Sequence, residues 1–168
     1  MREKTCVFIG HGECYGVSLE QIEKELERLI DWGITDFLCG GMGRFDWMCA
    51  RDVYELKKYQ KNIRCDLIIP YLTFRIPEFV YFDEILYPEG FEKYHFKAAI
   101  LARNQYMVDH AAYALCYVTH RWGGAAKIYE KAVKQGLTMI NLGNEELRKN
   151  YGTMQWNLDS IGKEWEKE

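Results

Sequence analysis

The sequence contains no apolar run of membrane-spanning length, and Met1-Arg2-Glu3-Lys4 leads straight into a strand-like segment. Neither a membrane protein nor a signal peptide is therefore expected. The net charge is only −3, with no excess of basic residues, so general nucleic-acid binding is disfavoured. Neither GxGxxG nor GxxxxGK[ST] occurs, which excludes the common dinucleotide fingerprint and the P-loop.

The six cysteines are scattered without a CxxC pair, and several lie in apolar runs, where cysteine acts as a small buried hydrophobe. Disulfides and a zinc site are disfavoured, and a reducing, cytoplasmic location is expected. The four histidines are equally dispersed, so we expect no metal site and no cofactor. These residues are Cys6, Cys14, Cys39, Cys49, Cys65 and Cys116, and His11, His95, His110 and His120.

The chain has three prolines: Pro70 lies just before segment 74–90, and Pro77 and Pro88 lie within it. We interpret this segment as a loop and a short strand ending near Leu86. No repeat or linker interrupts the chain, so its length predicts one domain, 1–145, followed by a helical tail, 146–168, that packs on it. The aromatic segment 71–87 and this tail are candidate interfaces for a homo-oligomer, and the oligomeric state stays open.

Short apolar segments alternate with helical patterns along the chain. This alternation predicts an α/β fold: a Rossmann-like, doubly wound, mainly parallel sheet in three α/β/α layers. Ser18 and Gln21 form a capping-box pattern at the start of the first helix. The predicted strands are 5–10, 36–39, 65–70, 113–118 and 137–142, and the predicted helices are 18–32, a helix after Gly43, 91–110 and 125–135.

Three of the predicted strands run into glycine clusters. Strand 5–10 ends at the first turn, Gly10-His11-Gly12, and strand 36–39 ends at the second turn, Gly40-Gly41-Met42-Gly43. Strand 113–118 leads into the third turn, which contains Gly123-Gly124. Strand-to-helix turns gather at the carboxyl edge of such a sheet, where ligands bind. Glycine permits close backbone approach, and the helix N-terminus behind favours an anion. Together the turns predict a site for a phosphate-bearing ligand.

Several side chains near these turns are candidates for ligand binding. His11 lies near the ligand or is a surface residue of a simple turn. Asp46 caps the second helix or binds a ribose hydroxyl. Arg103, beside Asn104 in an apolar helix, needs an anionic partner, either a ligand or a carboxylate of the protein. Glu130 lines the same cleft or is solvated, and its periodicity favours solvation.

The combination of Phe8-Ile9-Gly10-His11, Cys39-Gly40-Gly41-Met42-Gly43-Arg44-Phe45-Asp46, 102–109 (ARNQYMVD) and Gly123-Gly124 resembles the SLOG superfamily, and most closely its YpsA-like branch. The resemblance covers about residues 4–143. It implies a Rossmann-like domain that binds a nucleotide or nucleotide-derived ligand, without an established reaction. Gly12 and Ala125 stand where members of that branch often have Arg and Thr.

A more distant resemblance is to the DprA/Smf group and to the LOG-type phosphoribohydrolases, which use RKxxM and PGGxGTxxE. Arg103, Met107, Gly123, Gly124 and Glu130 match the LOG pattern, whereas 122, 126 and 127 depart from it. That resemblance implies catalytic roles for Arg103 and Glu130 at the ribosyl bond.

These observations lead us to three alternatives. The first is a sensor or binding module for a nucleotide-like small molecule, with Gly10, His11, Gly12, Gly40, Gly41, Gly43, Asp46, Arg103, Asn104, Gly123 and Gly124 as ligand-binding residues. The second is a hydrolase that cleaves the N-glycosidic bond of a nucleoside monophosphate. The third is a protein-interaction scaffold with a vestigial site. The first is our leading expectation.

Overall fold

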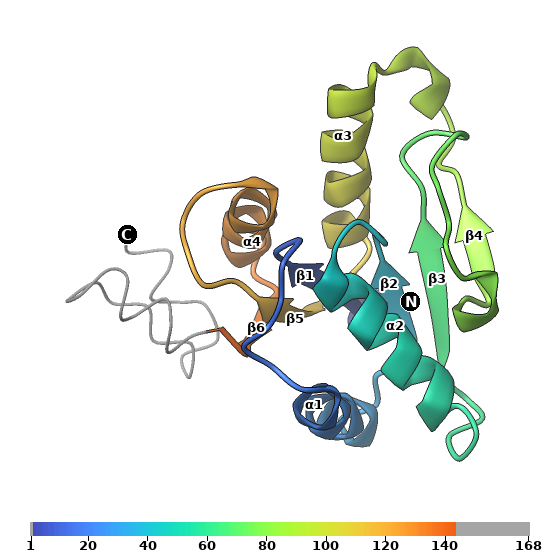
Figure 1. Cartoon of the computed structure of the whole chain (residues 1–168), viewed down its shortest axis with the longest axis vertical. Helices are drawn as coiled ribbons and strands as arrows, with labels where there is room; N and C mark the ends of the chain where they lie inside the picture. Colours follow the sequence, from blue (N-terminus) through green and yellow to red (C-terminus); the bar gives the residue numbers. More distant parts are fainter. Residues whose placement is uncertain (1, 144–168) are drawn as a thin grey trace.

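A six-stranded sheet forms the centre of the computed structural model, which describes residues 2–143 (Figure 1). Its strands are all parallel and have the order β4-β3-β2-β1-β5-β6. They are β1 (Thr5–Gly10), β2 (Asp36–Cys39), β3 (Arg64–Ile68), β4 (Glu84–Leu86), β5 (Tyr113–Tyr117) and β6 (Thr138–Asn141). This Rossmann-like α/β architecture confirms the predicted fold class.

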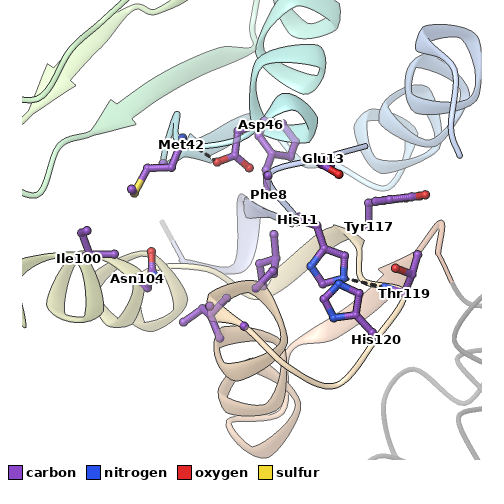
Figure 2. A pocket seen from close by; sticks show the side chains of 18 of the residues that line it. Phe8, His11, Glu13, Met42, Asp46, Ile100, Asn104, Tyr117, Thr119 and His120 are labelled. Carbon is purple, nitrogen blue, oxygen red and sulfur yellow. Dashed lines mark hydrogen bonds between the residues drawn. The ribbon is translucent and has the colours of Figure 1, made fainter. Parts of the chain in front are cut away.

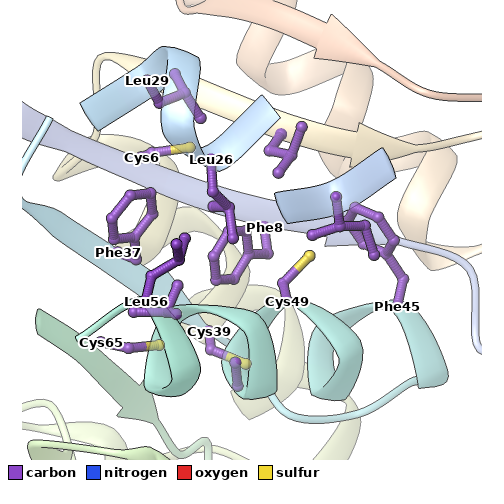
Figure 3. Close-up of a cluster of buried hydrophobic side chains, with 14 of the residues drawn as sticks. Cys6, Phe8, Leu26, Leu29, Phe37, Cys39, Phe45, Cys49, Leu56 and Cys65 are labelled. Carbon is purple, nitrogen blue, oxygen red and sulfur yellow. The ribbon is translucent and has the colours of Figure 1, made fainter. Parts of the chain in front are cut away.

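Helices cover both faces of the sheet because alternate residues of each buried strand point to opposite sides. Cys6 and Phe8 of β1 pack with α1 (Leu19–Asp31) and α2 (Arg44–Leu56) (Figure 3). Val7 and Ile9 pack on the other face with α3 (Phe96–Asp109) and α4 (Gly124–Lys134). The three-layer arrangement therefore follows from continuous apolar strands.

The helix boundaries agree closely with the prediction in the first half of the chain. Ser18 caps α1: its Oγ accepts from the Gln21 N–H at 3.2 Å, and the Gln21 Oε1 accepts from the Ser18 N–H at 2.8 Å. The predicted helix 91–110 is wrong at its start. A 3₁₀ turn, Phe91–Lys93, is followed by extended backbone at Tyr94 and His95 before α3 begins. Two further 3₁₀ turns are Arg2–Lys4 and Phe79–Tyr81.

All six cysteines are buried and unbridged, as expected of small hydrophobes. Cys6, Cys39, Cys49 and Cys65 lie together between the sheet and α1 and α2 (Figure 3). Within residues 2–143 no helix is long and apolar enough to span a membrane. The predicted tail, 146–168, lies outside the described residues.

Candidate functional site

A pocket of about 920 Å³ opens at the carboxyl edge of the sheet, beside the ends of β1, β2 and β5. Within the sheet, β2, β3 and β4 follow one another outward from one edge of β1. The next strands in the chain, β5 and β6, lie beyond the other edge of β1. The boundary between β1 and β5 is thus the topological switch point, where parallel α/β sheets bind ligands. Figure 2 shows the lining side chains from these turns and from α3.

The fold brings most of the predicted ligand-binding residues to this pocket. Those that line it are Gly10, His11, Gly12, Gly40, Asp46, Arg103, Asn104, Gly123 and Gly124. Gly41, Gly43 and Glu130 are not among its lining residues. Gly43 instead allows the first two turns to touch, because a Cβ there would lie 2.8 Å from the Gly12 Cα. Gly41 has a φ of 66°, a conformation that favours glycine.

His11 connects the first turn to the third. Its Nε2 accepts a hydrogen bond from the Thr119 N–H at 2.9 Å, which places the ring proton of the neutral form on Nδ1 (Figure 2). Burial, with the nearby His120 adding to it, lowers the pKa of His11 to about 4. The imidazole is therefore neutral at pH 7 and gives the pocket a hydrogen-bonding group without a positive charge.

Asp46 lies in the first turn of α2, directly after the second glycine cluster, where the sequence had suggested a phosphate-binding turn. Its Oδ2 accepts from the Met42 N–H at 3.2 Å, so the protein's own carboxylate lies at the N-terminus of α2 (Figure 2). Its Oδ1 is buried and has no hydrogen-bond partner among the described residues. Burial raises the pKa of Asp46 to about 6, against the opposing effect of Arg103. The second turn therefore presents an acceptor for a hydrogen-bond donor, which disfavours an anion there.

Arg103 is 2% exposed, and its side chain donates hydrogen bonds to backbone carbonyl groups at the ends of the sheet strands. Its Nη1 donates to the carbonyl oxygens of Gly40 at 2.8 Å and Ile68 at 2.9 Å, which join α3 to the ends of β2 and β3. Its Nε donates to the Asn104 Oδ1 at 2.9 Å. Gly40 is needed for this approach, because a Cβ there would lie 3.1 Å from the Arg103 Cζ. The guanidinium thus donates to neutral oxygens. The sequence had instead suggested an anionic partner, either a ligand or a carboxylate of the protein.

The third turn leads from β5 into the N-terminus of α4. Gly123 has a φ of 91°, and no side chain from residues 2–143 caps the helix. The first N–H groups of an α-helix have no partner inside the helix, so an uncapped N-terminus in a pocket favours an anion. A Cβ built on Gly124 would meet no atom within 4 Å. Of the turns, this one best retains the features of an anion site.

Several lining residues were not predicted from the sequence, including Met42, Tyr117, Thr119, His120 and Trp122. They immediately follow or interrupt the strand ends and glycine clusters, so a search of the residues flanking each predicted turn would have found them. No group of three or more His, Cys, Asp or Glu in residues 2–143 is arranged to hold a metal ion.

Comparison with solved structures identifies the fold independently. A solved structure of DNA processing protein A (DprA) from Helicobacter pylori matches with a TM-score of 0.60 and 15% identity, over 99% of this chain and 81% of that one. The chain shares its fold with DprA. DprA from Streptococcus pneumoniae matches with a TM-score of 0.57 and 16% identity, over 83% of this chain but only 50% of that one.

A third structure, TM1055, a structural genomics target, matches with a TM-score of 0.54 and 16% identity, over 81% of this chain and 72% of that one. No family model and no curated protein matches the sequence. The structural matches support the Rossmann-like fold that the alternation of apolar strands and helices predicts. At these identities they concern the fold alone.

Proposed function

We propose that the pocket binds a nucleotide or nucleotide-derived small molecule, as a sensor or binding module of the YpsA-like type. The observation that carries the proposal is one pocket at the switch point, lined both by the N-terminus of α4 and by Asp46; within residues 2–143 that N-terminus has no side-chain cap and the Asp46 Oδ1 has no hydrogen-bond partner. The N-terminus of α4 would take a phosphate, and the Asp46 Oδ1 would accept from a ribose hydroxyl.

The charges in the pocket favour a ligand with few phosphates. Arg103 already donates hydrogen bonds to the carbonyl oxygens of Gly40 and Ile68, and His11 is neutral at pH 7. Among the lining residues that the structure describes, the backbone of the third turn is the anion site that we favour, and two acidic residues, Asp46 and Glu13, also line the pocket. A nucleoside monophosphate or a dinucleotide therefore fits this pocket better than a nucleoside triphosphate.

We do not assign a reaction to the pocket. The hydrolase alternative places Glu130 at the ribosyl bond, and Glu130 is not among the lining residues. Release of free base from a nucleoside monophosphate by the wild type, lost in Glu130→Gln, would support that alternative. Helicobacter pylori DprA is described as binding single-stranded DNA. The net charge of −3 here favours a small ligand instead.

The test is thermal unfolding in the presence of AMP, ADP-ribose, NAD, cyclic nucleotides and a single-stranded oligonucleotide. A ligand at 100 times its Kd stabilises the native state by about 2.7 kcal/mol, which raises the Tm by roughly 5–10 °C for a domain of this size. Stabilisation by none of the small ligands would favour the scaffold, and stabilisation by the oligonucleotide alone would favour a DprA-like activity.

Two substitutions on α4 make the site assignment testable. Gly124→Ala places a methyl group in the open space of the third turn, and we expect it to weaken binding about tenfold or more, equivalent to about 1.4 kcal/mol. Glu130→Gln is the matched control, because it lies on the same helix outside the pocket lining. Equal binding by Gly124→Ala and the wild type would remove the third turn from the site.

A further inference from the structure

Three rings form a continuous stack at the edge of the pocket. His11, from the turn after β1, lies 3.8 Å from His120 between ring centroids, with an angle of 11° between the planes (Figure 2). His120 in turn lies 3.8 Å from Trp122, with an angle of 17°. The order is therefore His11, His120, Trp122, across two turns that are far apart in the sequence.

The inner end of this stack is fixed by the fold. The Nε2 of His11 accepts a hydrogen bond from the Thr119 N–H at 2.9 Å. The His11 and Tyr117 rings pack edge to face, with 6.4 Å between ring centroids and 83° between the ring planes. His120 follows Thr119 directly in the sequence. The hydrogen bond thus holds the His11 ring against the segment that carries His120. The two stacked imidazoles support one face of the Trp122 ring.

The outer end of the stack is open. Trp122 lines the pocket and remains 64% exposed although His120 covers one face of its ring. A large exposed indole is costly in water unless something covers it. Trp122 also precedes Gly123 and Gly124, so the open indole and the anion-binding backbone of α4 are neighbours in the chain.

We infer that Trp122 is the stacking surface for the planar base of the ligand, supported from behind by His120 and His11. The inference rests on the proposed function and adds a base-recognition residue to it. Stacking on an aromatic side chain accepts any base because every base has a π-face. Purines offer the larger ring area and bind more tightly. The phosphate then lies on the turn immediately after the tryptophan, and consecutive residues recognise the two ends of the nucleotide.

The test compares adenine ligands with a ligand that lacks the base. Titration calorimetry gives the Kd of AMP, ADP-ribose, NAD and ribose 5-phosphate for the wild type, Trp122→Ala and Trp122→Phe. We expect Trp122→Ala to weaken the adenine ligands about 5- to 150-fold and to leave ribose 5-phosphate unchanged. Trp122→Phe restores most of the lost affinity, because phenylalanine retains a stacking face.

Trp32→Ala is the matched control. Trp32 is 51% exposed at the end of α1 and is not among the residues that line the pocket. Its removal leaves every Kd unchanged, and an unaltered Tm shows that each variant is folded.

Two other outcomes are separable. Equal affinity of the wild type and Trp122→Ala for the adenine ligands overturns the stacking role while the proposed function stands. Failure of the wild type to bind AMP, ADP-ribose, NAD and ribose 5-phosphate overturns the proposed function, and the stacking role with it.

Discussion

Asp46→Asn is the substitution whose effect can be worked most fully from the structure. Asp46 is 8% exposed, one of its carboxylate oxygens has no hydrogen-bond partner among residues 2–143, and burial raises its pKa from 3.8 to about 6. A raised pKa of an acid means that the native state holds the proton more tightly than the unfolded state does. Ionisation therefore destabilises the native protein, and stability falls as the pH rises from about 4 to above 6.

The magnitude follows from the two pKa values. The ionised carboxylate costs the native state about 3 kcal/mol at pH 7.5 and only about 0.5 kcal/mol at pH 4. Asparagine has nearly the same shape and cannot ionise, and its Oδ1 can still accept from the Met42 N–H. The free energy of unfolding of Asp46→Asn relative to that of the wild type should thus rise by about 2–2.5 kcal/mol between pH 4 and pH 7.5.

Urea denaturation of both proteins at a series of pH values measures this difference. Other titrating groups cancel in the comparison, because they are present in both proteins. A difference that stays constant with pH, or that falls as the pH rises, would refute the idea that Asp46 is a destabilised buried carboxylate.

Three other predictions concern the support of the pocket. Gly10→Ala, whose Cβ would lie 2.5 Å from the Phe45 ring, should lower the free energy of unfolding by about 1–3 kcal/mol, whereas Gly124→Ala should change it by less than about 1 kcal/mol. Urea denaturation of the pair checks this, and equal effects would contradict the packing described for the first turn. Arg103→Met leaves the Gly40 and Ile68 carbonyls without their donor, and should cost about 2–4 kcal/mol in the same assay. An unchanged stability would show that these hydrogen bonds are dispensable. Burial raises the pKa of Cys6, Cys39, Cys49, Cys65 and Cys116. No thiol should react with Ellman's reagent in the native protein, and rapid reaction of any of these five before unfolding would contradict their burial.

The sequence predicted the fold well because its signals are local. The apolar strands are short and continuous, and the capping box of α1 needs only Ser18 and Gln21, which lie one helical turn apart. The start of α3 was harder to predict. Nothing between Phe91 and Phe96 is a glycine or a proline, yet the backbone at Tyr94 is extended. Phe96, the first residue of α3, packs against Tyr71 at 4.6 Å between ring centroids, a tertiary contact that a local sequence pattern does not report.

The site was predictable in its position but not in its chemistry. Glycines at strand ends indicate the carboxyl edge of the sheet, and there the pocket lies. The partners of Asp46 and Arg103 depend on how turns far apart in the sequence approach each other. Arg103 reaches the carbonyl of Gly40, a contact across 63 positions that no sequence pattern encodes. For the same reason the stack of His11 on His120 could not be foreseen.

The central claim is that the third turn and its neighbours bind a nucleotide. The most direct measurement is a ¹H–¹⁵N NMR titration of the protein with AMP, in which backbone amides and tryptophan side chains report separately. The account predicts saturable shifts at the Gly123 and Gly124 amides and at the Trp122 indole N–H, with the Trp32 indole unchanged. No shift at any of these three groups at millimolar AMP, or shifts confined to another part of the molecule, would contradict it.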